Sequence, residues 1–283
     1  MKKVIFLQDF FVEHNLGGAE LHDQVVIDYF SAQGLLYDKK RTVELTIEYV
    51  KQNKDKVWFI SNFTGLRNRI KAYLAKECKY IIYEHDYKFI DIRNPIGFAD
   101  FLVPLRNKVN LNFYRAAYKI ICLSKMHREI FDKNLNMNNI VNISCSMWSD
   151  SDLDLVRSLN ETPKKNKYAI INSSNPIKKT KETEQFCKER NIDYDLISSS
   201  NYQEFLQIMS QYRGLVFRTG HPEPTPRIAI EAKMLNCKFI SQKNLIGVAH
   251  EDYFSLSGTE LISKVKEMRD EALLRITGWI NEI

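Results

Sequence analysis

The sequence predicts an α/β fold in two halves, each built on a parallel sheet covered by helices. Short apolar runs of strand length alternate with amphipathic, helix-length segments throughout the 283 residues. A polar and charged stretch interrupts this alternation between Ser149 and Lys167, after which strands and helices resume. We therefore expect an N-terminal domain over residues 1–150 and a C-terminal domain over residues 167–283, joined by a linker.

The composition is typical of a soluble globular protein, with 44% hydrophobic and 27% charged residues. No apolar run approaches the ~20 residues of a membrane-spanning helix, and the first apolar run ends at Gln8, too early for a signal peptide. The five cysteines form no C-x-x-C motif, so we expect neither structural zinc nor a disulfide framework, and a cytoplasmic location fits. The net charge of +6 is compatible with anionic ligands, nucleic acid or a membrane surface and selects none of them.

The N-terminal half contains five runs that we expect to form buried strands. They cover residues 4–7, 57–60, 79–83, 118–124 and 139–144. A helix is expected after the first run, because Leu21, Val25 and Tyr29 recur at helical spacing, and another is expected over residues 125–135.

Gly17 and Gly18 lie in the turn before that first helix. A glycine pair at this place lets the backbone come close to a ligand and exposes N–H groups at the helix start. The alternative is a tight turn that needs positive φ, and the residues alone do not decide between the two.

His85 and Asp86 follow the run over residues 79–83. Open α/β sheets place their ligand-binding groups at the carboxyl ends of strands, so both side chains are candidates for a site. A capping or turn cluster is the alternative, and Arg93 at the end of this loop is interpreted as a solvated charge.

The C-terminal half repeats the alternation of strands and helices. Strands are expected over residues 168–171, 194–197, 214–217 and 238–240, with a last helix over residues 258–283. Lys178 and Lys179 lie between the first strand and the first helix of this half, where charged residues are usually solvated.

A helix is expected to begin after the turn-rich loop that follows the run over residues 214–217. Thr225 is a good N-cap, and Pro226 fits the first helical position. Asn236 can end the helix in the left-handed conformation.

Two glutamates belong to this loop and helix. Glu223 lies in the loop just before the helix, and Glu231 lies eight residues further along, about two helical turns away. The pair can hold two ends of one elongated polar ligand near a helix N-terminus, where phosphates bind well.

Glu223 and Glu231, followed by Ala232 and a small-residue turn into the next strand, resemble the two-glutamate signature of the retaining GT-B glycosyltransferases. In the large nucleotide-sugar-dependent group of this family (group 1, family-four-like), the signature reads E-G-F-G-L-x-x-x-E-A and lies between two strands, about four-fifths along the chain, as it does here. The resemblance implies the GT-B fold. In that fold two doubly wound, Rossmann-like parallel-sheet domains face a cleft, and the last helix packs back on the N-terminal domain.

The resemblance also implies an activity, which is transfer of a sugar with retention at the anomeric carbon. The donor would be a nucleotide sugar, and the acceptor a hydroxyl group of a glycan or a small molecule. Glu231 would take the ribose hydroxyls of the donor, and Glu223 the sugar hydroxyls near the reacting centre. One of Lys178 and Lys179, without a choice between them, matches the family's diphosphate-binding position.

Four more residues are assigned by the same resemblance. His85 corresponds to a histidine that contacts the donor sugar, with Asp86 as an orienting or acceptor-side group. Gly17 and Gly18 would lie close to the donor phosphates and the acceptor. Arg227 is either solvated or adds positive charge beside the phosphates, and the second interpretation is favoured because the helix dipole already opposes a cation there.

The sequence departs from the family pattern in the loop before the helix. Pro224 and Pro226 replace both glycines and lack an N–H group. The remaining donors to the nucleotide sugar are the amides of Thr225, Arg227 and Ile228 and the Thr225 hydroxyl. The glycine that usually follows the phosphate-binding lysine is also absent.

No metal is expected, because a lysine and the helix dipole can neutralise the diphosphate, and no cofactor is expected beyond the donor itself. The Asp152-x-Asp154 sequence lies in the predicted linker and is discounted. Two other functions stay open. The positive charge permits an enzyme whose acceptor is a nucleic-acid base, and the proline-substituted loop permits a catalytically silent module that binds sugar nucleotides. The oligomeric state is not predicted.

Overall fold

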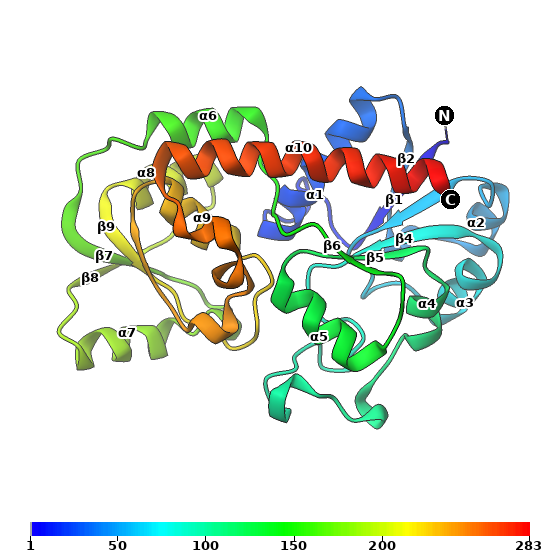
Figure 1. Cartoon of the computed structure of the whole chain (residues 1–283), viewed down its shortest axis with the longest axis horizontal. Coiled ribbons are helices and arrows are strands. Elements are labelled where there is room, and N and C mark those ends of the chain that lie inside the picture. The colour runs from blue at the N-terminus through cyan, green and yellow to red at the C-terminus, as the bar shows by residue number, and fades with distance from the viewer. Residues whose placement is uncertain (1) are drawn as a thin grey trace. The chain divides into compact units, whose positions relative to one another are not determined.

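The computed structural model describes residues 2–283 and divides them into two compact units (Figure 1). The first unit contains residues 2–147 together with Arg269–Ile283, and the second contains Trp148–Met268. Each unit has its own parallel sheet and its own hydrophobic core.

The sheet of the first unit has six parallel strands in the order β2-β1-β3-β4-β5-β6. The strands are β1 (Val4–Gln8), β2 (Leu36–Arg41), β3 (Val57–Ile60), β4 (Lys79–Tyr83), β5 (Lys119–Cys122) and β6 (Ile140–Asn142). The helices are α1 (Gly18–Ala32), α2 (Ile47–Gln52), α3 (Asn68–Glu77), α4 (Leu111–Ala116) and α5 (Lys125–Leu135). Because parallel crossovers are right-handed, α1 covers one face of the sheet and the later helices cover the other. Burial on both faces explains why β1, β3 and β4 are nearly continuous apolar runs.

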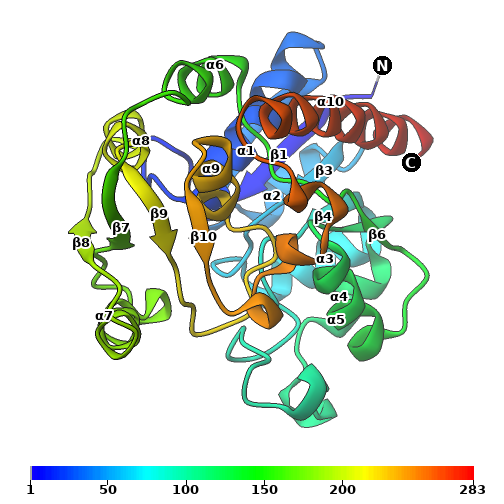
Figure 2. The same cartoon turned by 60° about the vertical axis from the view of Figure 1, so that its left-hand side comes forward.

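The sheet of the second unit has four parallel strands in the order β10-β9-β7-β8 (Figure 2). The strands are β7 (Lys165–Ile171), β8 (Tyr194–Ile197), β9 (Tyr212–Val216) and β10 (Lys238–Ile240). The helices are α6 (Asp150–Ser158), α7 (Thr180–Glu189), α8 (Tyr202–Ser210) and α9 (Arg227–Met234). Helix α7 lies on one face of this sheet, and α8 and α9 lie together on the other (Figure 2). The last helix, α10 (Gly258–Glu282), begins in this unit, and its residues from Arg269 onward belong to the first unit.

The strand order of each sheet reverses beside its first strand. The reversal lies between β1 and β3 in the first unit, and between β7 and β9 in the second. Open α/β sheets bind ligands beyond the carboxyl ends of the strands at such a reversal. The loops after these four strands are therefore where each unit is expected to carry its site.

The predicted pair of doubly wound parallel sheets is confirmed, and each run expected to form a strand does so. Strand β2 is not predicted from the sequence. Four of its six residues are charged and its side chains are only partly buried, because it is an edge strand.

The predicted linker is wrong over its first half, where Asp150–Ser158 forms α6. The Ser149 side chain caps this helix, and Leu153 and Val156 are buried on one face of it. The polar composition of the stretch is therefore that of the exposed face of an amphipathic helix. Strand β7 also begins inside the predicted linker, at Lys165.

The predicted cap of α9 is also wrong. The helix begins at Arg227, and the cap position is occupied by Pro226, with φ −62° and ψ 113° and no side-chain hydrogen bond. Thr225 therefore lies one residue outside the cap. Asn236 takes the left-handed conformation as predicted, with φ 58°.

Helix α1 forms where it is predicted, but it buries a different face. Val26 and Phe30 are buried together with Asp23, whereas Leu21 and Val25 are only partly buried. A carboxylate can occupy this face because it is fully hydrogen-bonded there, as described below.

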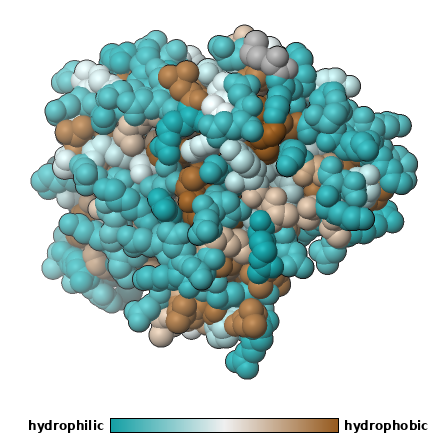
Figure 3. Space-filling model, turned by 45° about the vertical axis from the view of Figure 1, so that its right-hand side comes forward, coloured by the Kyte–Doolittle hydropathy of each residue, from teal (hydrophilic) through white to brown (hydrophobic). Residues whose placement is uncertain are grey.

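The surface agrees with the polar composition of the sequence. No helix within residues 2–283 is both long enough and apolar enough to cross a membrane. On the face shown in Figure 3, hydrophilic residues predominate and hydrophobic side chains are scattered among them. All five cysteines are buried and carry free thiols.

Candidate functional site

The loops after β7 and β9 bring Lys178 and Glu223 together at the sheet reversal of the second unit. Lys178 ends a short turn, η4 (Pro176–Lys178), and its Nζ donates to Oε1 of Glu223 at 2.9 Å. The lysine side chain is 31% exposed and the glutamate side chain 15%. The ammonium group also lies 5.3 Å from the centre of the Phe217 ring. A cation and a carboxylate thus share the position at which such sheets bind ligands.

Lys179 pairs with a different carboxylate. Its Nζ lies 2.8 Å from Glu182 on the exposed surface. Its backbone has φ 50°, the left-handed conformation that glycine adopts most readily. The Lys178–Lys179 step therefore has the backbone of a Lys-Gly step, and Lys178 is the lysine that reaches Glu223.

The backbone of Glu223 is fixed by the segment that follows β10. Its N–H donates to the carbonyl of Leu245 at 2.8 Å, and its carbonyl accepts from the N–H of Gly247 at 2.8 Å. Pro224 has no N–H to contribute to this pairing. The loop is thus held on both sides of the Glu223 side chain without the glycine amides of the family pattern.

Glu231 lies on α9 and is only 2% exposed. Its Oε1 accepts hydrogen bonds from Nε1 of Trp148 at 2.9 Å and from the hydroxyl of Tyr202 at 2.7 Å. Its Oε2 makes no hydrogen bond within residues 2–283. Burial raises the pKa of Tyr202 well above its usual value, and the Glu231 carboxylate raises it further, so this hydroxyl stays a donor. The carboxylate is held in one orientation with one oxygen available to a ligand.

Arg227 is buried beside Glu231, so the less favoured alternative of a solvated charge is wrong. Its guanidinium lies 4.6 Å from the Trp148 ring centre, its Nη2 donates to the Tyr202 hydroxyl at 2.8 Å, and its Nε lies 3.3 Å from Glu231 Oε1. Burial alone would lower the pKa of Arg227, but Tyr202 and Glu231 raise it. The guanidinium thus neutralises Glu231. Its contact with the donor phosphates stays a prediction.

The hydroxyl of Thr225 is buried and lacks a hydrogen-bond partner within the described residues 2–283. The residue is 8% exposed. A buried polar group without a partner costs free energy. A polar ligand that binds in front of α9 can supply the missing hydrogen bond.

In the first unit, His85 follows β4 and is held by a carboxylate from α1. Its Nε2 lies 2.7 Å from Oδ1 of Asp23, and Oδ2 of Asp23 accepts from the hydroxyl of Ser61 at 2.5 Å. Asp23 is fully buried, and 9% of the His85 side chain is exposed. Ser61 follows β3, so these residues join α1 to the carboxyl ends of two neighbouring strands.

His22 packs edge-on against His85, with 5.0 Å between the ring centres. Both nitrogens of His22 are engaged, Nδ1 with the hydroxyl of Ser146 at 2.9 Å and Nε2 with the hydroxyl of Tyr83. We call His22, Asp23, Ser61, Tyr83 and His85 the histidine cluster.

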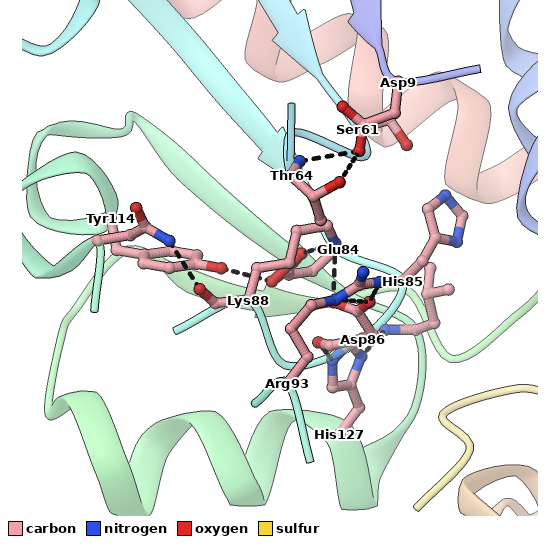
Figure 4. A network of polar contacts seen from close by, with 12 residues as sticks. Asp9, Ser61, Thr64, Glu84, His85, Asp86, Lys88, Arg93, Tyr114 and His127 are labelled. Atoms are coloured by element: carbon pink, nitrogen blue, oxygen red, sulfur yellow. Dashed lines mark hydrogen bonds and ion pairs between the residues drawn. The ribbon is translucent and has the colours of Figure 1, made fainter. Parts of the chain in front are cut away.

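Asp86 belongs to a second set of polar contacts, shown in Figure 4. Its carboxylate lies 3.0 Å from Nζ of Lys88 and accepts from Nε of Arg93 at 2.9 Å. Burial alone would raise the pKa of Asp86, but the two cations lower it to about 2. The sequence suggested that Arg93 is a solvated charge. In the structure it is paired with Asp86. Asp23, and not Asp86, is the carboxylate that orients His85.

The same contacts extend inward to buried groups (Figure 4). Lys88 donates to Glu84, whose other oxygen accepts from the Tyr114 hydroxyl at 2.6 Å. Burial raises the pKa of Glu84, while Asp86 and Glu84 raise that of Lys88 against the effect of burial. These pairings fix the start of the loop that carries Asp86.

His127 of α5 is hydrogen-bonded to the backbone of that loop. Its Nε2 donates to the carbonyl of Asp86 at 2.9 Å, and its Nδ1 accepts from the N–H of Leu123 at 3.3 Å. Burial lowers the pKa of His127 to about 3. The ring is therefore neutral, with both nitrogens in use.

Gly17 and Gly18 lie at the start of α1, as predicted. Gly17 is the cap residue with φ −114°, and neither glycine has positive φ, so the alternative of a positive-φ turn is wrong. A Cβ at Gly17 would lie 2.3 Å from a carboxylate oxygen of Glu20. Burial raises the pKa of Glu20, which lies near Asp23 and His85. A side chain at position 17 would therefore displace this carboxylate from its present place.

The predicted residues form two separate groups, one in each unit. Three side chains that orient them are not predicted from the sequence, namely Asp23, Trp148 and Tyr202. No sequence signal distinguishes Asp23, because its helix also carries Glu20 and Asp28. Within residues 2–283, no group of three His, Cys, Asp or Glu side chains is placed to hold a metal ion.

Neither a protein-family sequence model nor a curated protein sequence matches the chain, whereas solved structures do. A sucrose-phosphate synthase from Thermosynechococcus elongatus has a TM-score of 0.62 at 10% identity, over 100% of this chain and 98% of that chain. HepE from Anabaena, with UDP and glucose bound, has a TM-score of 0.56 at 12% identity, over 98% of this chain and 100% of that chain. An α-glucosyltransferase in complex with UDP and a 13-mer DNA containing an HMU base has a TM-score of 0.52 at 10% identity, over 96% of this chain and 91% of that chain.

All three are glycosyltransferases of one architecture. The chain has the GT-B fold. The fold predicted from the two-glutamate resemblance is confirmed, and the reversal in the second GT-B sheet is where Lys178 and Glu223 meet.

Proposed function

We propose that this protein is a retaining glycosyltransferase that moves a sugar from a uridine-diphosphate sugar to a hydroxyl acceptor. The observation that carries the proposal is the arrangement in the second unit. Lys178 and Glu223 meet at the sheet reversal, and Glu231 lies buried and oriented on the helix that follows. These are the residues that match the signature of the retaining GT-B enzymes.

Glu231 takes the ribose hydroxyls of the donor in this proposal. Trp148 and Tyr202 occupy its Oε1, and Arg227 supplies the counter-charge, so Oε2 is the oxygen that accepts from the ribose. Uridine is proposed as the base because several structures of the same fold contain UDP or a UDP-sugar.

Lys178 neutralises the leaving diphosphate, together with the amides at the start of α9. Stabilising charge that develops on a leaving group is among the largest contributions to catalysis. The orphaned Thr225 hydroxyl, no longer needed as a helix cap, is proposed to bond to the donor. With a lysine and a helix N-terminus at the diphosphate, the proposed reaction is independent of metal.

Glu223 binds the sugar hydroxyls near the reacting centre in this proposal. Its hydrogen bond to Lys178 places that carboxylate beside the group that receives the diphosphate. In the first unit, His85 contacts the sugar and Asp86 lies on the acceptor side, while Gly17 and Gly18 lie near the phosphates and the acceptor.

The acceptor is proposed to be a glycan or a small molecule. A nucleic-acid base is the second candidate, because one structure of the same fold contains DNA with an HMU base and this chain carries a net charge of +6. Binding to DNA would weaken steeply with salt, since each phosphate contact releases counterions. We also propose a cytoplasmic location, which the five free thiols support.

The test is a transfer assay with UDP-glucose and other UDP-sugars against panels of sugar, small-molecule and DNA acceptors. The anomeric configuration of the product is read by NMR. We expect an α-linked product from an α-linked donor, and we expect Glu231→Gln to abolish transfer while Glu182→Gln, on the exposed surface, retains it. A β-linked product would overturn retention. Binding of UDP-sugar without transfer to any acceptor would identify a silent binding module.

A further inference from the structure

The two ring nitrogens of His85 have different surroundings. Nε2 lies 2.7 Å from the fully buried carboxylate of Asp23. Nδ1 has no hydrogen-bond partner within residues 2–283, and 9% of the His85 side chain is exposed. One edge of the ring is thus held by the protein, and the other is left for a ligand.

The partner of Nε2 determines which nitrogen carries the proton. An ionised carboxylate only accepts hydrogen bonds, so Nε2 must carry a hydrogen to pair with Asp23. In the neutral ring Nδ1 then has a lone pair and can only accept.

We propose that Asp23 is a positioning residue that holds His85 as the Nε2–H tautomer, so that Nδ1 accepts a hydrogen bond from a hydroxyl group of the bound sugar or acceptor. The inference rests on the proposed function, because it names the chemistry that His85 offers to the substrate of that same site. It assigns a role to Asp23, which the two-glutamate signature does not contain.

The surroundings of Asp23 oppose any other arrangement. Its second oxygen accepts from Ser61 at 2.5 Å, so the carboxylate has a donor on each side. His22 and Tyr83 pack edge-on against the His85 ring, at 5.0 Å and 5.3 Å between ring centres. A ring flip would turn Nε2 away from Asp23 and leave a buried carboxylate oxygen without its donor, which costs free energy.

Within residues 2–283, the other carboxylates near His85 have partners of their own. Glu20, which lies near Asp23 and His85, is hydrogen-bonded to the Asn15 side chain. The Asp86 carboxylate is occupied by Lys88 and Arg93, and the Asp86 carbonyl by His127. The histidine cluster thus contains one carboxylate in contact with His85, and the tautomer depends on it.

The first arm of the test is the ¹⁵N NMR spectrum of the imidazole rings in the full chain without substrate, with the His85 signals assigned by their loss in His85→Gln. We expect His85 to show a protonated Nε2 and an unprotonated Nδ1. Asp23→Leu should lose this single tautomer, whereas Ser61→Ala, which leaves the carboxylate in place, should retain it. A protonated Nδ1 in the native protein would overturn the inference, whether or not Asp23→Leu folds.

The second arm measures transfer. Loss of a hydrogen bond at an oriented acceptor predicts that kcat/KM falls about 10- to 100-fold in Asp23→Leu, while Asp28→Leu, at an exposed position of the same helix, stays close to the native value. Binding of UDP alone should be unchanged in both variants, because the His85 ring that Asp23 orients is proposed to contact the sugar or the acceptor, and UDP contains neither. A single native tautomer with equal transfer by both variants would overturn the catalytic part of the inference. Failure of the native protein to bind any nucleotide sugar would instead contradict the proposed function.

Discussion

Lys178 and Glu223 are 45 residues apart in the sequence, and their side chains meet at 2.9 Å beyond the carboxyl ends of two adjacent strands. The parallel crossover of the second sheet produces this meeting, since it brings the loops after β7 and β9 to the same edge. The pair therefore joins a cation suited to a diphosphate with a carboxylate suited to sugar hydroxyls.

Replacing Lys178 by methionine should weaken donor binding about 10- to 100-fold, because a charge-assisted hydrogen bond to the diphosphate is lost. The measurement is the dissociation constant for UDP by isothermal titration calorimetry. Stability should change little, since the lysine is partly exposed.

Lys179→Met is the matched control, because this side chain pairs with Glu182 on the surface. It should bind UDP as the native protein does. Equal weakening in the two lysine variants would contradict the assignment of Lys178.

Replacing Glu231 by glutamine should reduce affinity for UDP while leaving affinity for inorganic pyrophosphate unchanged. The physical reason is that the carboxylate accepts from both ribose hydroxyls, whereas the amide offers one acceptor and one donor group. Competition binding with uridine, UDP and pyrophosphate separates the two contributions. Weaker pyrophosphate binding in this variant would show that Glu231 acts on the phosphates instead.

Replacing Arg227 by methionine should lower the free energy of unfolding by about 3–5 kcal/mol, because the buried Glu231 carboxylate loses its cation. Arg227→Lys should be intermediate, since an ammonium group restores the charge without the planar contact to the Trp148 ring. Urea denaturation measures both. Arg190→Met, which removes an exposed cation over the Phe186 ring, should cost only about 0.5–1 kcal/mol.

Stability should fall as the pH drops from about 6.5 toward 3 because of His127, whose pKa is lowered from 6.5 to about 3 by burial. Between these values the unfolded chain binds a proton that the folded protein does not, so the unfolded state gains stability. The contribution is at most about 1.4 kcal/mol per pH unit for one proton.

The check is the pH dependence of urea unfolding in the native protein and in His127→Gln. The variant can keep a donor to the Asp86 carbonyl but has no titrating ring, so its curve should be shallower in this window. His250→Gln, at an exposed histidine, is the control and should keep the native slope. Parallel native and His127→Gln curves would contradict a buried neutral His127.

The fold could be predicted because both sheets are buried on two faces, which makes their strands apolar runs that stand out from the helices between them. The failures have the same physical origin. Strand β2 is an edge strand with four charged residues, and α6 shows its polar face in a stretch that resembles a linker.

The site could be predicted in part, where residues lie at strand ends or helix starts. Glu223, Lys178 and His85 occupy such places, and Glu231 is found from its eight-residue spacing to Glu223. Asp23 occupies no such place, because it is brought to His85 only by the packing of α1 on the sheet.

Trp148 and Tyr202 reach Glu231 from other elements of the second unit. The choice between Lys178 and Lys179 depended on a backbone dihedral angle. Neither these contacts nor this angle can be inferred from a sequence pattern.

The most direct test of the central claim is the melting temperature of the protein with millimolar UDP-, GDP-, ADP-, CMP- and dTDP-linked sugars in the absence of added metal. A ligand that binds only the folded state stabilises it by about 2.7 kcal/mol at a hundredfold excess over its dissociation constant, which corresponds to a shift of several degrees. We predict a shift with UDP-sugars that is lost in Lys178→Met and retained in Lys179→Met. No shift with any nucleotide sugar would contradict the account.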